Sequence, residues 1–260
     1  MIIDMNAYLG HWPFRQLRYN TTATLLELMD AKGIDRAVVS SASAIFYKNS
    51  QAGNEQLAGD IRQHRDRLIP FAVINPTYAD WKYDLQTCVR EFGVKGLRLY
   101  PNYHNYRLSD TSCRELVKAA SEHGLLVSIP IRATDRRQSH WLVDIPDVLL
   151  EDVAQLVKTH PDTQFILLNG IGYLNSPLGQ QNSNLPQNYF IEISRLSAVL
   201  QSEIRQLLNN LGSDRVVFGT GMPFNYPDPA LVKLEVLEAT EDELEAMRWR
   251  NTARLLGNEV

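Results

Sequence analysis

The sequence is poor in cysteine and has no long apolar run. Cys88 and Cys113 are the only cysteines among 260 residues, too few for a disulfide framework and unlike the spacing of a zinc finger. No apolar stretch approaches the roughly 18 residues of a membrane span. The first residues lack the basic and apolar segments of a signal peptide. We therefore expect a cytoplasmic protein with no membrane partner.

Positive charge is also scarce. The chain has 26 Lys and Arg against 30 Asp and Glu, a formal net charge of -4. Because a nucleic-acid-binding protein presents a clustered basic face, we expect no nucleic-acid partner. Three common signatures are missing from the sequence as well: the Gly-x-Ser-x-Gly elbow, the Gly-Lys-Ser/Thr phosphate loop and the Gly-x-Gly-x-x-Gly fingerprint. The sequence therefore favours neither a nucleophilic serine nor a cofactor.

What the sequence does have is a regular alternation of short β-rich runs with amphipathic stretches. The runs are eight in number and begin at residues 2, 35, 68, 94, 125, 164, 189 and 215. Helical patterns separate them, such as residues 109–124, where Ser109 is a suitable N-cap and Gly124 a suitable stop. Strands that alternate with helices predict parallel βαβ units, and eight units predict a (β/α)₈ TIM barrel. We expect residues 1–260 to form one such domain.

Strand side chains alternate between two faces, which allows each run to be divided. In the first run Ile3, Met5 and Ala7 are apolar and should pack under the helices, so its polar side chains should point into the barrel. The same rule predicts a polar constellation from six strands: Asp4, Asn6, Asn75, Arg98, Arg132, Asn169 and Glu192. Since branched aliphatic side chains usually fill a barrel interior, this constellation indicates a functional site.

Two interpretations of the constellation remain open. Buried charge is costly unless it is paired, so Asp4 and Glu192 need partners, and Arg98 and Arg132 are available. Such pairs would form a structural network that holds the barrel together. In the other interpretation, the guanidinium groups bind a small anionic molecule through paired hydrogen bonds. The location of the charges at the ends of strands favours this second interpretation.

Several segments of the chain resemble those of a known superfamily. They are "IIDMNAYLG", "INP", "GLRLYP", "HPDTQFILLNG" and "VVFGTGMP". In this order they are similar to segments of the amidohydrolase superfamily, in the branch of aminocarboxymuconate-semialdehyde decarboxylase and the dicarboxylate lactonases. The likeness covers essentially the whole chain. It implies a barrel enzyme, a hydrolase or a lyase, with a metal in its active site.

The metal ligands that this resemblance implies are replaced in the present sequence. The family has two histidines on the first strand, where this chain has Asn6 and Tyr8, and one on the sixth, where it has Asn169. The histidine of the fifth strand has no counterpart. Gly221 stands at the place of the eighth-strand aspartate, whereas Asp4 matches the family's first-strand aspartate. Catalytic zinc takes three ligands from Cys, His, Asp and Glu, so we expect no metal here.

The loops that follow the strands offer other candidate residues. Tyr100 and Tyr103, just beyond the fourth strand, are suited to line a pocket for a sugar-like or aromatic ligand. Histidine side chains are common general acids and bases, so His104 and His140 are candidates for proton transfer, and Asp135 could orient His140. A substitute metal site made of His104, His140 and Glu192 is chemically adequate, although no spacing in the sequence brings the three together.

The sequence thus predicts a metal-independent hydrolase or lyase for a small anionic or sugar-derived substrate such as a lactone, whose activated carbonyl needs less electrophilic help than an amide. The residues assigned to catalysis are His104, His140, Glu192 and Asp4. Those assigned to the substrate are Asn6, Tyr8, Asn75, Arg98, Tyr100, Tyr103, Arg132 and Asn169. The alternative is a non-catalytic barrel that binds a small ligand or a partner protein. In either case the chain could assemble as a homo-oligomer.

Overall fold

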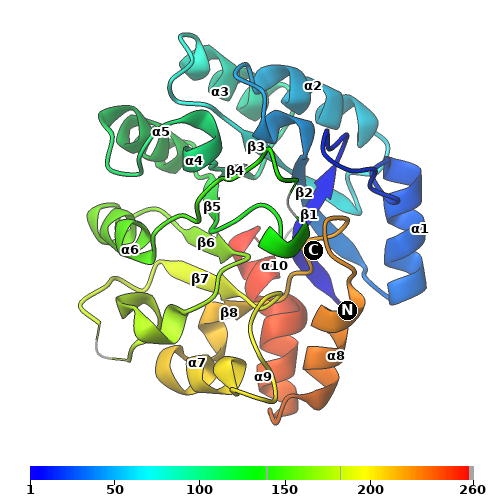
Figure 1. Ribbon diagram of the computed structural model, residues 1–260, viewed down its shortest axis with the longest axis vertical. Coiled ribbons are helices and arrows are strands. Elements are labelled where there is room, and N and C mark those ends of the chain that lie inside the picture. The colour runs from blue at the N-terminus through cyan, green and yellow to red at the C-terminus, as the bar shows by residue number, and fades with distance from the viewer. Residues whose placement is uncertain (139, 182, 258–260) are drawn as a thin grey trace.

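The computed structural model describes residues 1–138, 140–181 and 183–257, and it shows a ring of parallel strands surrounded by helices (Figure 1). The strands are β1 (Ile3–Leu9), β2 (Arg36–Ser41), β3 (Leu68–Val73), β4 (Gly96–Arg98), β5 (Leu126–Pro130), β6 (Phe165–Leu168), β7 (Tyr189–Glu192) and β8 (Val216–Val217). They form an eight-stranded sheet in sequence order. The predicted (β/α)₈ TIM barrel is confirmed.

The first and last strands meet and close the ring. The backbone N–H of Met5 donates to the carbonyl of Phe218 at 3.0 Å, and that of Tyr8 donates to Met222 at 2.9 Å. Ala7 also forms a parallel bridge with Met222. Because β8 itself is short, the segment just after it completes the seam with β1.

The helices mostly lie outside the ring of strands, while α10 lies across its end (Figure 1). They are α1 (Thr22–Lys32), α2 (Gln51–Asp60), α3 (Trp81–Arg90), α4 (Pro101–His104), α5 (Thr111–Glu122), α6 (Leu150–Thr159), α7 (Glu203–Leu211), α8 (Asp228–Val236), α9 (Glu241–Glu245) and α10 (Asn251–Leu255). A π-helical turn at Ala246–Arg250 joins the last two. Among the helices of the described residues, none has the length and apolar character needed to cross a membrane.

Local signals set the ends of these helices. At α1 the side chains of Thr21 and Thr24 form a reciprocal capping box, and Gly33 ends the helix with a φ of 65°, which glycine adopts without strain. At α5 the N-cap is Asp110 and not Ser109, one residue later than we expected. The Asp110 carboxylate accepts the N–H of Arg107 at 2.8 Å and so closes the turn before the helix.

Apolar side chains fill both the space under the helices and the barrel itself. Ala7 and Leu9 pack against Leu25 and Met29 of α1. The interior cluster has members from several strands and includes Met5, Val38, Phe71, Ile166, Phe190 and Val217. The expectation that Met5 faces the helices was therefore wrong. The register between β1 and β2 shifts by one residue between Asp4 and Ala7, and such a bulge changes the face of the residues beside it.

The end of the chain covers the barrel at the end where the strands begin. Leu256, directly after α10, packs in the same interior cluster as Met5 and Leu126. The opposite end, where the strands finish, carries the loops that contain most of the predicted site residues. A barrel of this kind has its active site at that opposite end.

Candidate active site

Asp4 lies deep in β1 and is fully buried. Its carboxylate accepts three hydrogen bonds: from the N–H of Thr220 at 3.0 Å, from the Thr220 hydroxyl at 2.5 Å and from the N–H of Asn6 at 2.8 Å. Burial nevertheless raises the pKa of Asp4 to about 7, and the charge of Glu192 acts in the same direction. The partners of Asp4 are therefore neutral hydrogen-bond donors and not an arginine. Because its pKa is about 7, its carboxyl group can gain or lose a proton near neutral pH.

Asn169, at the end of β6, connects three other strands. Its side-chain oxygen accepts a hydrogen bond from Asn6 Nδ2 at 2.8 Å, and its Nδ2 donates to the hydroxyl of Tyr8 at 3.4 Å and to the carbonyl of Arg132 at 3.2 Å. Its backbone has a φ of 54°, a left-handed conformation that few residues other than glycine and asparagine adopt. Such conformations are often retained where a site requires them.

Glu192 ends β7 directly beside this asparagine. Its carboxylate accepts the N–H of Asn169 at 3.0 Å, the hydroxyl of Ser194 at 2.9 Å, the N–H of Ser194, and Asn6 Nδ2 at 3.4 Å. Burial raises the pKa of Glu192, while the hydrogen bonds from Asn169 and Ser194 oppose that rise. No ion pair is formed between Glu192 and any described arginine or lysine within 4.0 Å, contrary to the sequence expectation.

Together these residues form what we call the polar network: Asp4, Asn6, Tyr8, Asn169, Glu192, Ser194 and Thr220. Most of the predicted constellation is therefore brought together. Alternation in the seventh run had directed Ser194 into the barrel together with Glu192, but no role was assigned to it. Thr220 was not predicted; its position three residues after β8 is the signal in the sequence that could have found it.

Arg98, in β4, is fully buried beside the network. Its guanidinium donates to the carbonyls of Ala7 at 3.2 Å and Met5 at 3.4 Å and to the Ser128 hydroxyl at 3.3 Å, and it lies 4.7 Å from the centre of the Tyr8 ring. Among the described residues it forms no ion pair. Arg98 therefore holds β1 and β5 through neutral acceptors, and it leaves a buried positive charge beneath the network.

Two further arginines, Arg132 and Arg195, follow β5 and β7 on either side of Asn169. Arg132 forms an ion pair with Asp147, and Arg195 forms one with Asp135 at 3.2 Å. Their side chains are 12% and 18% exposed. Both acids belong to the loop between β5 and α6, so the Arg195 pair joins this loop to the segment after β7, and the Arg132 pair links two ends of the loop. Arg195 was not predicted.

The two predicted histidines lie outside the polar network. His104 is buried, and its Nε2 is 3.2 Å from the carbonyl oxygen of Ala44; burial lowers its pKa. His140 accepts the N–H of Leu142 at its Nδ1, at 3.2 Å, and its ring lies 5.7 Å from that of Phe14. The expected bond from Asp135 to His140 is not formed among the described residues.

The remaining predicted residues have clear positions. Asn75 lies apart from the network: its oxygen accepts the N–H and the hydroxyl of Thr77, and its Nδ2 donates to the carbonyl of Lys48 at 3.1 Å. Tyr100 is buried beneath the mouth of the barrel, with its ring 6.0 Å from that of Tyr103. Asn75 thus stabilises the turn after β3, whereas the two tyrosines belong to the mouth.

Aromatic side chains close that mouth. Trp12 lies at the centre, with ring centroids 4.8 Å from Phe224 and 4.9 Å from Phe46, and the group that we call the aromatic cap consists of Trp12, Phe14, Phe46, Tyr103 and Phe224. Phe224 reaches down to Tyr8, 4.8 Å away. Beneath the cap, the side chains of Asp4, Asn6 and Glu192 have no exposed surface. These three side chains are therefore sealed from solvent in this conformation, whereas Ser194 of the same network is partly exposed.

Comparison with known proteins agrees with this geometry. A family model for amidohydrolases matches residues 5–257. The chain belongs to the amidohydrolase family. The resemblance drawn from the sequence is confirmed, and so is the prediction of an enzyme of this superfamily, a hydrolase or a lyase. No curated protein matches the sequence.

Several solved structures share the fold over almost the full length. The chain is similar to 5-carboxyvanillate decarboxylase from Sphingomonas paucimobilis (TM-score 0.76, 14% identity, 98% of each chain covered). It is also similar to a manganese-bound dihydroxybenzoic acid decarboxylase from Polaromonas sp. JS666 (0.72, 16%, 100% of this chain and 98% of that one). A third is a probable 2-pyrone-4,6-dicarboxylic acid hydrolase from Acinetobacter baumannii with citric acid bound (0.68, 15%, 98% and 99%). At these identities the likeness shows the fold alone.

The residues at the implied metal positions do not fit a divalent ion. Asn6 and Asn169 are bonded directly to each other at 2.8 Å, and neither amide is a ligand that zinc prefers. Gly221 has a φ of 74°, and a Cβ there would lie 2.5 Å from Nδ2 of Asn225, so an aspartate would have a strained backbone and the side chain of Asn225 would have to move. No group of three His, Cys, Asp or Glu side chains suited to a metal occurs in the described part of the chain. His104, His140 and Glu192 accordingly do not form the substitute site.

Proposed function

We propose that this protein is a metal-independent hydrolase or lyase for a small carboxylated substrate with a ring, such as a lactone or a hydroxybenzoate. The relatives with known structures include decarboxylases of hydroxylated benzoates and a pyrone dicarboxylate hydrolase, which supports a small anionic substrate. Metal independence is supported by the bond between Asn6 and Asn169 at the place where the family binds its metal.

The observation that carries the proposal is the presence of two buried carboxyl groups that form no ion pair within 4.0 Å among the described residues, although the charge of Lys233 lowers the pKa of Glu192. Asp4 and Glu192 belong to one hydrogen-bonded network and both have raised pKa values. A structural network would pair them with arginines, as Asp135 and Asp147 are paired in the loop above. Carboxyl groups whose pKa is raised toward neutrality are instead suited to take up and release protons during catalysis.

The proposed roles follow from position. Glu192 is the proton donor or acceptor, since it lies beside the two asparagines, and Asp4 lies one layer deeper and sets the charge that Glu192 senses. The amides of Asn6 and Asn169 supply hydrogen bonds to the oxygen on which negative charge develops, a role worth several kcal/mol in a dry site. For His104 and His140 a role in proton transfer stays a prediction.

Arg132 and Arg195 are the proposed anchors for the substrate carboxylate. Each already binds a carboxylate of the β5–α6 loop, and both flank Asn169 at the rim of the barrel. A substrate reaches the network only when the aromatic cap parts, and its carboxylate then replaces Asp147 or Asp135 on the arginine. Trp12 and Tyr103 would contact the ring of the substrate, because flat rings pack well against aromatic side chains. A cytoplasmic location and a homo-oligomer also stay predictions.

The test separates turnover from binding. We would incubate the protein with a panel of carboxylated lactones and hydroxybenzoates, and compare it with Glu192→Gln, Asp4→Asn, His104→Gln and His140→Gln. Loss of a general acid or base lowers rates by about 10²- to 10⁴-fold, and we expect this for Glu192→Gln with binding retained by calorimetry. The matched control is Glu122→Gln, an exposed glutamate of α5, which should leave turnover unchanged.

The other outcomes are equally informative. If Glu192→Gln turns over as fast as the unmodified protein while His140→Gln does not, the proton is moved at the rim and the proposed roles are wrong. If the panel yields ligands that bind and none that react, the protein is a barrel that binds its ligand without catalysis. Circular dichroism on each variant excludes unfolding as the cause of a lost activity.

A further inference from the structure

Lys233 of α8 is a partly buried cation that binds the backbone beside the polar network. Its ammonium group donates to the carbonyl of Ile193 at 3.2 Å and to the carbonyl of Ser194. Among the described residues, Lys233 forms no ion pair. Because moving a charged group out of water is costly, packing alone does not account for a lysine at this position.

The two carbonyls belong to the turn that holds Glu192. The N–H and the hydroxyl of Ser194 both donate to the Glu192 carboxylate, the hydroxyl at 2.9 Å. Lys233 therefore binds the carbonyls of the short segment 193–194, while Glu192 binds the N–H and the hydroxyl of the same segment. Because this segment directly follows Glu192, fixing its carbonyls also fixes the direction of the Glu192 side chain.

The charges of Lys233 and Glu192 act on each other as well. Burial raises the pKa of Glu192, and the charge of Lys233 is among the influences that oppose the rise. Burial lowers the pKa of Lys233, and the charge of Glu192 opposes that change. Two further charges face Lys233: Arg195 lowers its pKa and Glu203 of α7 raises it. Glu192 in turn faces Asp4 of β1. Lys233 is thus a cation that favours the ionised form of the Glu192 carboxyl.

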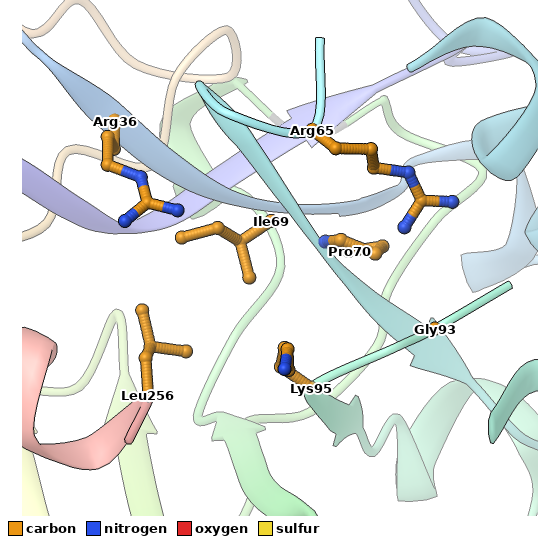
Figure 2. A pocket seen from close by; sticks show the side chains of 7 residues that line it. All are labelled: Arg36, Arg65, Ile69, Pro70, Gly93, Lys95 and Leu256. Atoms are coloured by element: carbon orange, nitrogen blue, oxygen red, sulfur yellow. The ribbon is translucent and has the colours of Figure 1, made fainter. Parts of the chain in front are cut away.

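Other cations of the barrel lie away from this turn. Arg36, Arg65 and Lys95 line a cavity of about 220 Å³ (Figure 2). This cavity lies where the strands begin, at the opposite end of the barrel from the aromatic cap. Lys233 differs from these three because it binds the segment that follows Glu192 and because its charge acts on that carboxyl group.

We propose that Lys233 is a positioning residue of the candidate active site, which holds the segment 193–194 and thereby keeps the Glu192 carboxylate beside Asn6 and Asn169. The inference rests on the proposed function, in which Glu192 moves the proton. Because α8 lies outside the ring of strands (Figure 1), Lys233 acts through the turn and not on the substrate. Without its ammonium group, the turn loses two charge-assisted hydrogen bonds, and Glu192 loses a cation that favours its ionised form.

Two variants separate the charge of Lys233 from its packing. Lys233→Met removes the ammonium group and keeps a side chain of similar length, whereas Lys233→Arg keeps the positive charge and its donors. Carbon-13 NMR of glutamate-labelled protein measures the pKa of Glu192, whose signal is the one missing from Glu192→Gln. We expect this pKa to be higher in Lys233→Met than in the unmodified protein and in Lys233→Arg. The matched control is Lys118→Met, at an exposed lysine of α5, which should leave the pKa of Glu192 unchanged.

Turnover of a substrate from the panel gives a second readout. Lys233→Met should lower kcat about tenfold, the effect of losing one charge-assisted hydrogen bond. The limb of the pH profile that Glu192 produces should also move to higher pH, since the pKa of Glu192 rises. A purely structural contact would lower the activity without moving that limb. Lys233→Arg and Lys118→Met should keep the pH profile of the unmodified protein.

Two results would overturn the proposal. One is an unchanged pKa of Glu192 in folded Lys233→Met. The other is an equal loss of turnover in Lys233→Met and Lys233→Arg with an unshifted pH profile, which would make Lys233 a structural contact only. If Lys233→Met does not fold, Lys233→Gln decides through the same titration, because it removes the charge and keeps a donor for the carbonyls. If no compound of the panel reacts, the proposed function fails, and the NMR titration alone then decides whether Lys233 acts on Glu192.

Discussion

The side-chain amide of Asn6 donates to the side-chain oxygen of Asn169 at 2.8 Å, across the barrel from β1 to β6. In the family pattern, both positions hold histidines that bind metal. Here one amide donates to the other, and Glu192 and Ser194 complete the arrangement, while the side-chain oxygen of Asn6 is buried with no hydrogen-bond partner among the described residues. We propose that this hydrogen bond stands where the resemblance implies a metal ion, and this relationship leads to several predictions.

The left-handed backbone of Asn169 predicts an order of stability among its variants. Asn169→Gly keeps the backbone conformation but removes the side-chain hydrogen bonds. Its free energy of unfolding, measured in urea, should therefore be about 1–3 kcal/mol lower than that of the unmodified protein. Asn169→Ala removes the same bonds and also strains the backbone, which adds about 1–2 kcal/mol. We expect alanine to be the less stable of the two, and the reverse order would contradict the role we assign to φ.

Asp4 predicts a dependence of stability on pH. The ordinary pKa of an aspartate is 3.8, and in the folded protein the pKa of Asp4 is about 7, so between these values the folded state binds more protons than the unfolded one. The free energy of unfolding should therefore fall as the pH rises from about 4 to 7. Asp4→Asn removes this titration, and urea unfolding across the window should give a flatter curve. Asp162 is exposed, so Asp162→Asn serves as the control, and its free energy of unfolding should change with pH as it does in the unmodified protein. If the free energy of unfolding of Asp4→Asn falls just as steeply with pH, a group other than Asp4 is responsible.

The ion pair of Arg132 with Asp147 predicts that removing an acid strengthens anion binding. In Asp147→Asn, Arg132 loses the carboxylate with which it forms an ion pair. Benzoate should then bind up to about fivefold more tightly at low ionic strength, because a partly exposed ion pair contributes at most about 1 kcal/mol. Calorimetry measures this directly. Glu115→Gln, which removes the same charge from an exposed pair between Glu115 of α5 and Lys82 of α3, should have no effect. Weaker binding in Asp147→Asn would mean that the loop itself is needed to hold the anion.

The fold was accessible from the sequence because the pattern of eight β-rich runs is regular. The inward direction of Asp4, Asn6 and Glu192 also followed from alternation. Met5 was assigned to the wrong face because a one-residue bulge leaves no mark in the pattern of apolar residues. The alternation of side chains along a strand predicts which face a side chain points to, but it does not predict the residue with which that side chain forms a hydrogen bond or ion pair.

The partners of the buried charges were the part that sequence reasoning missed. Asp4 was expected to pair with an arginine and is bonded to Thr220, 216 residues away. Arg132 was considered as a partner of the buried acids and, in the favoured interpretation, as an anchor for an anion; it pairs with Asp147 in its own loop. The path of the loops over the barrel mouth determines which charged side chains form ion pairs. The periodic pattern of apolar residues does not predict that path.

The measurement that tests the central claim most directly is the metal content of the protein, determined by elemental mass spectrometry after purification without chelator or affinity tag. Because amides occupy the positions of the family's histidines, the account predicts Zn, Mn, Fe, Co and Ni far below one equivalent, and turnover that is unchanged by a chelator. Close to one equivalent of any of these metals, removed by chelator together with the activity, would contradict it.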